Sequence, residues 1–360
     1  MNTPNGFSDN PFMIGYDSRI FEGDKKLGFK FPQGKFITSE GFCSLDKLIE
    51  EIKRRTGYPT ILNIGDSSTS GWNSDRTFKG NNDPHSAFFT YKTYSDLMRG
   101  QLLVNVINAG VPGYTSLQGK KYLEDLLKRL ASKGIIPDYV TIYFGNNDCT
   151  YNQFEDKLRL DFKKGSPESR GERVSVQDYK KNIAQMIETV KEYGAKPIII
   201  VPLVRYEWEP GVRSMVHIDE FEKALGAIDS SLKEEIERAR ELYFIGERGK
   251  VIELDRVLPR IKPRYRRALF KVARETKTPI IDVQSKIRKD NEHFVDYCHP
   301  NERTNQMIVD KFREIRNKDL FYVKFKDRVA KFFNRFLGTK KKEEEKPELP
   351  QLPTDIYTLY

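Results

Sequence analysis

The alternation of five short apolar segments with amphipathic stretches is the feature that most limits how this chain can fold. Each apolar segment is rich in Val, Ile or Tyr, which is typical of a strand that is buried on both faces. Because parallel strands need crossover helices, this order predicts a doubly wound α/β fold, a three-layer α/β/α sandwich around a five-stranded parallel sheet. The predicted strands are 60–64, 103–108, 139–144, 197–202 and 278–283, and the predicted helices are 85–101, 115–133, 175–193 and a longer helical region of about 218–275.

Polar, glycine-containing segments follow the first three predicted strands. Function in such sheets gathers beyond the carboxyl ends of the strands, so we expect a site at this edge. Each segment alone also fits ordinary local structure, because Ser67 can cap a helix while Gly110 and Asn147 can shape turns. Their occurrence at three successive strand ends favours a shared site. The segments are GDSSTSG (65–71), AGVPGYTS (109–116) and GNNDCT (145–150).

A serine that acts as a nucleophile needs a general base, and histidine is the usual base near neutral pH. Of the four histidines, His299 is the best candidate because it lies in FVDYCHPN, between the last predicted strand and a C-terminal helix. Asp296 precedes it by three residues, so a tight turn can aim the carboxylate at the imidazole. His293 lacks the proline-terminated turn, and we expect it, like His85 and His217, to be a structural or surface residue.

Four segments, in this order, resemble the conserved blocks of the SGNH (GDSL-type) hydrolase family. GDSSTSG resembles the serine block, NAGVPG the glycine block, GNND the third block, and DYCHPN the block with aspartate and histidine. The resemblance covers about 60–316 and implies a flavodoxin-like version of the predicted fold. It also implies removal of acyl groups from lipids, sugars, peptidoglycan-type polymers or thioesters.

Carried over by position, the resemblance gives each catalytic role a residue. Ser67 would be the nucleophile, His299 its general base, and Asp296 the group that orients the base. The resemblance thus implies an ester hydrolase, an esterase or deacylase that works through a covalent acyl-enzyme. An O-acyltransferase with the same triad and a catalytically inactive binding module are the alternatives.

The same carry-over implies an oxyanion hole made of the backbone N–H groups of Ser67 and Gly110 and the side chain of Asn147. Asp66 and Asp148 would support their loops. No pair of histidines has the spacing of zinc ligands, so the sequence predicts no metal, and this chemistry predicts no cofactor.

The segments outside the core predict the domain organisation and the substrate class. Residues 24–42 resemble the β-rich lead-in of some bacterial members from polysaccharide gene clusters, which favours an O-acyl group on a carbohydrate, a small-molecule or glycan ester. The helical insertion between the fourth and fifth strands fits either a degenerate tetratricopeptide-type hairpin or an elongated crossover, with its second helix at 250–260. The predicted parts are a lead-in (1–58) packed on the core, a hydrolase domain (59–316) with the insertion (about 205–276), a basic amphipathic helix (317–338) and a disordered tail (339–360).

Positive charge is concentrated near the end of the chain. The formal net charge is +10, but residues 317–342 hold nine Lys and Arg against two Asp, a local charge of +7. The rest is only mildly basic and shows no nucleic-acid-binding motif, so we expect no nucleic-acid partner. Residues 321–338 place aromatic side chains at helical spacing among Lys and Arg. This pattern predicts a helix that either rests on an anionic membrane face or docks onto the protein or a partner subunit.

Cysteine usage and the N-terminus lead to a prediction of location. The three cysteines, Cys43, Cys149 and Cys298, are odd in number and include no C-x-x-C pair, which favours a reducing compartment. Residues 1–12 lack the basic and apolar regions of a secretory signal, and no run approaches the ~18 consecutive apolar residues of a membrane span. These observations predict a cytoplasmic protein, with peripheral contact at the cytoplasmic membrane face through 321–338 as the alternative.

Overall fold

A computed structural model describes most of the chain in two compact units, Met1–Val309 and Asp310–Tyr360. The tail predicted at 339–360 lies outside the described residues, as do His85 and His217. The described residues are 21–24, 26–31, 34–38, 41–72, 91–150, 172–206, 231–255, 260–287, 292–296 and 298–336, apart from the side chains of Phe29, 231–233 and 322–336.

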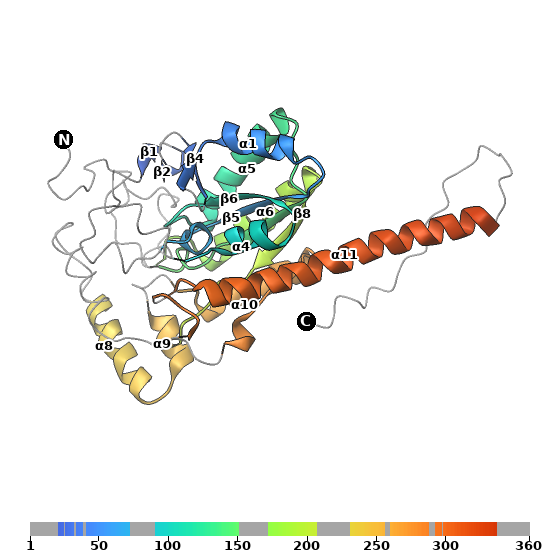
Figure 1. The fold of residues 1–360 in the computed structure, drawn as a ribbon. Helices are drawn as coiled ribbons and strands as arrows, with labels where there is room; N and C mark the ends of the chain where they lie inside the picture. Colours follow the sequence, from blue (N-terminus) through green and yellow to red (C-terminus); the bar gives the residue numbers. More distant parts are fainter. Residues whose placement is uncertain are drawn as a thin grey trace. The chain divides into compact units, whose positions relative to one another are not determined.

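A five-stranded parallel sheet forms the centre of the first unit, which confirms the predicted fold (Figure 1). Its strand order is β6-β5-β7-β8-β9. In the register of the sheet, Gly65 lies opposite both Gly110 and Tyr143, so the first three strands end level with one another. The strands are β5 (Thr60–Gly65), β6 (Asn105–Gly110), β7 (Tyr139–Tyr143), β8 (Lys196–Ile200) and β9 (Ile280–Ile281).

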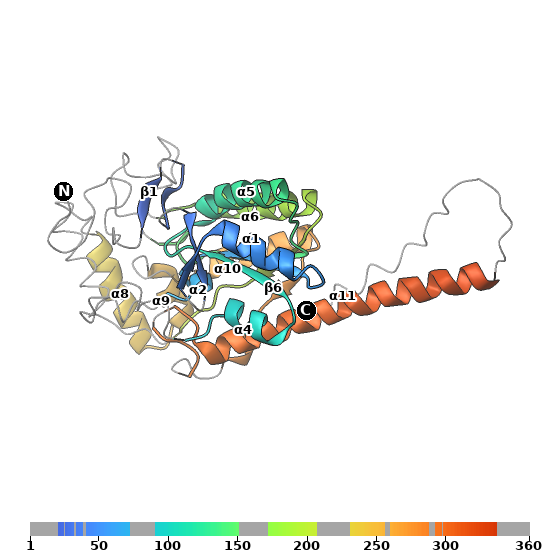
Figure 2. The same ribbon diagram turned by 45° about the horizontal axis from the view of Figure 1, so that its top comes forward.

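Helices cover both faces of this sheet, as right-handed crossovers require. Figure 2 shows α5 and α6 on one face and α4 on the other. Side-chain caps set where these helices begin: Thr93 and Thr115 each form a reciprocal capping box, with Asp96 and Gln118 respectively, and Ser175 caps α6. The helices are α4 (Tyr94–Gln101), α5 (Ser116–Ser132) and α6 (Val176–Glu192).

The lead-in adds two short hairpins and one helix to the same unit. Phe21, Phe31 and Phe36 belong to the buried apolar cluster that also contains Leu62 and Ile107 of the central sheet. The lead-in therefore shares the core of the sheet. Its elements are β1 (Glu22–Asp24), β2 (Gly28–Lys30), β3 (Phe36–Thr38), β4 (Gly41–Cys43) and α1 (Leu45–Arg54).

The insertion between β8 and β9 is helical, but its second helix is shorter than predicted. This helix ends at Leu254 and not near residue 260. Lys262 has extended backbone angles, because a proline disfavours the helical region for the residue that precedes it. Pro263 then begins the next helix. The helices of the insertion are α8 (Ser231–Phe244), α9 (Arg248–Leu254) and α10 (Pro263–Glu275).

The chain continues after β9 through a 3-10 turn (η5, Gln284–Lys286) into the long helix α11 (Glu302–Phe336). The boundary predicted at 316/317 falls inside this helix and not between two elements. In the second unit, ion pairs of Lys311 with Glu314 and of Arg313 with Asp310 lie along the helix. None of the described helices has an apolar stretch long enough to span a bilayer.

The packing of α5 against the end of β7 gives a test of the core. A Cβ atom on Gly119 would overlap the ring of Phe144, with the ring's Cε1 atom only 2.8 Å away. We expect Gly119→Ala to lower the free energy of unfolding by about 1–3 kcal/mol, because a close-packed core accommodates an added methyl group poorly. Gly100→Ala is the matched control, since this helical glycine has no atom within 4 Å of its added Cβ. Alanine stabilises a helix there, so equal losses of melting temperature in the two variants would contradict the packing.

Candidate active site

The turn that carries Ser67 lies directly against the ends of two strands. The short helix α2 (Ser67–Ser70) follows β5, and the Asp66 side chain caps it by accepting a hydrogen bond from the Ser68 amide at 2.9 Å. A Cβ atom on Gly65 would overlap the Thr69 side chain and lie 2.9 Å from the Tyr143 carbonyl oxygen. A Cβ on Gly110 would lie 2.7 Å from the Thr69 Cβ. Glycine at both strand ends therefore lets the turn sit close to the sheet.

The structure brings Ser67, His299 and Asp296 together in one hydrogen-bonded row. His299 Nε2 lies 2.7 Å from Ser67 Oγ, and His299 Nδ1 lies 2.6 Å from Asp296 Oδ2. The other carboxylate oxygen of Asp296 accepts the backbone amides of Cys298 at 2.9 Å and His299 at 2.8 Å. These bonds close a tight turn that aims the carboxylate at the imidazole. Ser67 is 8% exposed, and Asp296 and His299 are each 2% exposed.

The electrostatics of this row determine where the protons lie. Burial alone would raise the pKa of Asp296, but the adjacent His299 and the hydrogen bonds from His299 and Cys298 outweigh burial and hold the pKa below its usual range. Asp296 is therefore ionised at neutral pH and can only accept hydrogen bonds. His299 must carry its proton on Nδ1 to bond Asp296, which leaves the lone pair of Nε2 facing the Ser67 hydroxyl.

The three groups predicted to hold an oxyanion are close to Ser67, and two of them already donate to the protein. The Asn147 side-chain amide donates to Asp66 Oδ2 at 3.3 Å and to the Tyr114 carbonyl at 3.1 Å. The Gly110 amide donates to Asn108 Oδ1 at 3.1 Å. Ser67 is the first residue of α2, so its own amide has no acceptor within that helix.

The two other aspartates of the motif segments are buried and hold backbone groups. Asp148 accepts the Ser116 amide with both carboxylate oxygens, at 3.0 and 3.1 Å, at the N-terminus of α5. A negative charge is favourable there because it faces the positive end of the helix dipole. Burial raises the pKa of Asp66 to about 6, against which its hydrogen bond from Ser68 and the nearby His299 act only in part.

Two neighbouring groups on the 292–301 segment have different surroundings. The His293 ring contacts the Thr304 hydroxyl at 2.9 Å, and that hydroxyl in turn donates to the His293 carbonyl at 2.8 Å. Cys298, His299 and Asp296 form the one group in the described ranges whose ligand atoms could converge on a metal, within 4.8 Å of one another. A metal there would compete with the hydrogen bond between Asp296 and His299.

Sequence reasoning missed the arginine that contacts the turn of Asp296. Arg205, in the segment after β8, donates from Nη1 to the Asp296 carbonyl at 2.9 Å. This segment, LVRYEWEPG, shows only a charged and aromatic character in the sequence. No spacing pattern links an arginine to a carbonyl group 91 residues away, so only the folded chain identifies this contact.

The pKa of Asp66 makes the stability of the fold depend on pH. Its carboxyl keeps its proton up to about pH 6 in the folded chain, against an ordinary value of 3.8. The group therefore stabilises the folded state fully below about pH 4, and this contribution of roughly 3 kcal/mol is lost as pH rises through 6. We expect the free energy of unfolding of Asp66→Asn, measured by urea denaturation, to decline less than that of the wild type between pH 4 and 7.

Asp138→Asn is the matched control for this measurement. Asp138 is exposed and also accepts a backbone amide, that of Thr60 at 2.7 Å. This variant should keep the pH dependence of the wild type. If Asp66→Asn also keeps it, the proton of Asp66 does not control stability in this range.

Comparisons with known proteins give one curated relative and several solved structures that match part of the chain. An uncharacterized lipoprotein, YqeF, of Bacillus subtilis is 28% identical over 151 residues, which is 41% of this chain and 51% of the relative. The acetylxylan esterase Axe2 of Geobacillus stearothermophilus matches 71% of this chain and 92% of its own, with 19% identity and a TM-score of 0.35. A GDSL-like lipase of Bacteroides thetaiotaomicron matches 75% and 98%, with 15% identity and a TM-score of 0.39. The match to this chain thus spans about half the length of the Bacillus relative.

The prediction of a cytoplasmic location is wrong on this comparison. The Bacillus relative is named a lipoprotein, which points to a membrane-anchored protein. The prediction rested on an odd number of cysteines and on the composition of residues 1–12. The three cysteines are free and buried, a state that shields thiols in any compartment and so does not identify one.

A family model gives the assignment of the chain. The model of the GDSL-like Lipase/Acylhydrolase family matches residues 64–307, about two thirds of the sequence. This range contains all four motif segments and the whole row from Ser67 to Asp296. The match confirms the predicted family: the chain belongs to the GDSL-like lipase/acylhydrolase family.

Proposed function

We propose that the chain hydrolyses esters with Ser67 as the nucleophile, His299 as the general base and Asp296 as the group that orients the base. The observation that carries this proposal is the 2.7 Å contact between Ser67 Oγ and His299 Nε2. Its support is the 2.6 Å contact between His299 Nδ1 and Asp296 on the other side of the ring. Together they supply a nucleophile, a base with the correct tautomer and a charge that stabilises the imidazolium.

The reaction follows from this row in two halves. Ser67 Oγ attacks the carbonyl carbon of the ester while its proton moves to His299 Nε2. The tetrahedral species collapses when the C–O bond to the alcohol breaks, and His299 returns the proton to the leaving alcohol. Water then gives its proton to His299 and attacks the acyl-serine, and Ser67 recovers its proton as the acid is released.

The negative oxygen of each tetrahedral species needs donors, and we assign this role to the amides of Ser67 and Gly110 and to the Asn147 side chain. Asn147 projects from the loop after β7 and lies within hydrogen-bond distance of Asp66, the residue before the nucleophile. Its amide would turn from Asp66 or Tyr114 toward the developing oxyanion. Asp66 and Asp148 then support the loops that carry these donors.

The substrate we propose is an O-acyl group on a carbohydrate. This choice follows from residues 24–42, which resemble the lead-in of bacterial members from polysaccharide gene clusters. Within the family, a small-molecule or glycan ester fits the same row of residues. Release of free acid from acylated sugars, and not of a new sugar ester, is the product that distinguishes hydrolysis from acyl transfer.

Labelling with a fluorophosphonate probe tests the nucleophile. We expect the wild type to carry the label on the peptide that contains Ser67, and Ser67→Ala to carry none. His299→Ala should be labelled about 10²–10⁴-fold more slowly, because the serine then has no base. The measurement is intact mass against time, followed by peptide mapping.

His293→Gln is the matched control, because it alters a second buried histidine on the same segment. The His293 ring contacts Thr304 and not Ser67, so this variant should be labelled at the rate of the wild type. A folded wild type that takes no label at Ser67 would refute the proposed nucleophile. Equal labelling of His299→Ala and His293→Gln would refute the proposed base.

Steady-state kinetics test the role of Asn147. We expect Asn147→Ala to lower kcat for a small ester by about 10²–10³-fold with little change in KM, because the lost donor acts on the transition state. Asn105→Ala is the control: this buried amide also donates to two backbone carbonyls, at 3.2 and 3.1 Å, but at the opposite end of the sheet. If both variants lose the same fraction of kcat, Asn147 serves the fold alone.

A further inference from the structure

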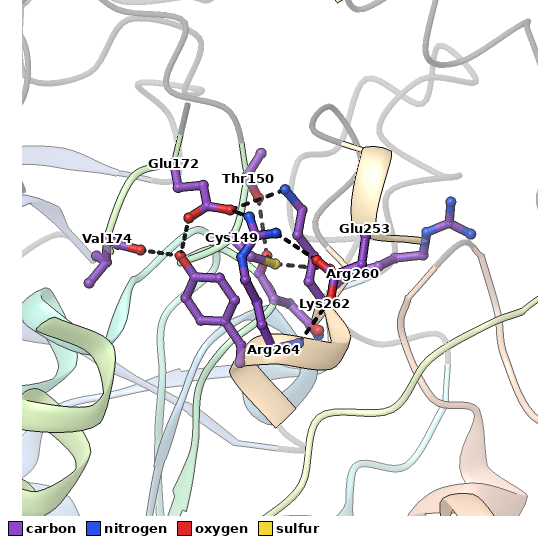
Figure 3. Close-up of polar contacts among 10 residues, drawn as sticks. Cys149, Thr150, Glu172, Val174, Glu253, Arg260, Lys262 and Arg264 are labelled. Carbon is purple, nitrogen blue, oxygen red and sulfur yellow. Dashed lines mark hydrogen bonds and ion pairs between the residues drawn. The ribbon is translucent and has the colours of Figure 1, made fainter. Parts of the chain in front are cut away.

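The short segment 260–262, between α9 and α10, contains two buried cations. The side chains of Arg260 and Lys262 are each 1% exposed. Buried cations are rare unless they are paired, and both have partners here. Arg260 pairs with Asp255 through Nη2, and through Nε at 3.1 Å. Lys262 Nζ lies 3.3 Å from Glu172 (Figure 3). These ion pairs favour one conformation of the segment, because moving it away from Asp255 and Glu172 would leave two buried cations without a counter-charge.

The backbone of this segment holds the loop that carries Asn147. The Cys149 thiol donates to the Arg260 carbonyl at 2.9 Å, a contact that Figure 3 shows. The Ile261 amide donates to Asn146 Oδ1 at 3.0 Å. Residues on both sides of Asn147 are therefore bonded to the insertion. The position of this loop at the edge of the sheet depends on a segment more than a hundred residues further along the chain.

The side chain of Arg260 leads in the other direction, toward the turn of Asp296. Its Nη1 donates to the Arg205 carbonyl at 3.1 Å. The Arg205 guanidinium donates in turn to the Asp296 carbonyl at 2.9 Å. Two hydrogen bonds thus connect the buried Arg260 to the turn that fixes His299. One segment of the insertion is bonded to the loops after β7 and β8 and, through Arg205, to the turn after β9.

We propose that Arg205 and Arg260 are positioning residues that hold the Asn147 loop and the Asp296–His299 turn in the alignment required for attack by Ser67. This inference rests on the function proposed above. These loops come from separate strands, so nothing covalent fixes their mutual distances. A misplacement of about 1 Å at such a site costs about 10²-fold in rate, so the hydrogen bonds that position these loops affect catalysis.

The first arm of the test measures kinetics on the full chain with p-nitrophenyl acetate. We expect Arg205→Met to lower kcat by about 10- to 100-fold with KM within about twofold, and Arg205→Lys to recover part of the loss. Arg99→Met is the matched control, because Arg99 also donates to a backbone carbonyl, that of Val106, at 2.9 Å. It should keep the kcat of the wild type. If Arg205→Met has a lower melting temperature but the kcat of the wild type, the proposal is overturned.

The second arm does not require activity and follows the protonation of His299 by NMR of histidine-labelled protein. The chain has four histidines, and His299→Gln assigns the signal. The groups that face this ring are Asp296 and Cys298 on its own turn and Ser67 and Asp66 on the opposite one. We expect the titration midpoint of His299 to be lower in Arg205→Met than in the wild type, because a displaced carboxylate stabilises the imidazolium less.

The two arms distinguish failure of the positioning role from failure of the proposed function. A wild type that neither hydrolyses the ester nor labels at Ser67 refutes the function, while the His299 midpoint still decides the positioning role. A titration midpoint of His299 that is the same in the wild type, Arg99→Met and Arg205→Met overturns the positioning role. A lower midpoint in Arg205→Met supports it.

A paired substitution tests the Arg260 end without leaving a buried charge alone. Asp255→Asn combined with Arg260→Gln removes both charges of the pair. We expect this paired variant to lose as much kcat as Arg205→Met. Adding Arg205→Met to the paired variant should cause no further loss, because both interrupt one chain of hydrogen bonds. If kcat of the combined variant falls by the product of the two separate losses, the two changes act independently, and the proposed link from Arg260 through Arg205 is overturned.

Discussion

The close approach of the Ser67 turn to the ends of two parallel strands is the constraint on which the rest of the site depends. Gly65 and Gly110 lie opposite one another in the sheet, and a Cβ atom on either would collide with Thr69. Without side chains there, the turn can sit on the edge of the sheet and present the serine to its neighbours. The loops after the level strand ends then reach it within hydrogen-bond distance.

Asp66 and Asp296 are buried close together, yet their pKa values are shifted in opposite directions. Burial acts on both and favours the neutral acid. Asp296 overcomes burial through His299 and two backbone amides, so it stays charged and serves the imidazole. Asp66 has weaker compensation, and burial therefore dominates its pKa. The nearby His299 and the hydrogen-bond donors of each turn, and not the residue type, move the pKa values of the two aspartates in opposite directions.

The strands and the polar segments that follow them could be predicted because their signals are local. Apolar runs such as 60–64 and glycine-containing turns such as 65–71 show their structure within a few residues. The contact between Ser67 and His299 joins residues 232 positions apart. Residue types and local segments made both residues candidates, and the resemblance to a family gave them their roles. The second helix of the insertion was predicted to run through Pro259 to residue 260, but α9 ends at Leu254. The proline was a local sign of an earlier end, because a proline disfavours the helical region for the residue before it. Arg205 was missed because its contact with the Asp296 carbonyl joins residues 91 positions apart.

The hydrogen bonds of Asn147 in the resting site have a consequence for how an enzyme of this kind treats its substrate. Its two N–H groups already bind a carboxyl oxygen and a carbonyl oxygen. A neutral ester carbonyl is no better an acceptor than these, so it gains little by displacing them. An oxyanion is a much better acceptor and competes successfully. Donors that are satisfied at rest therefore discriminate by charge, and they direct binding energy away from the ground state and toward the transition state.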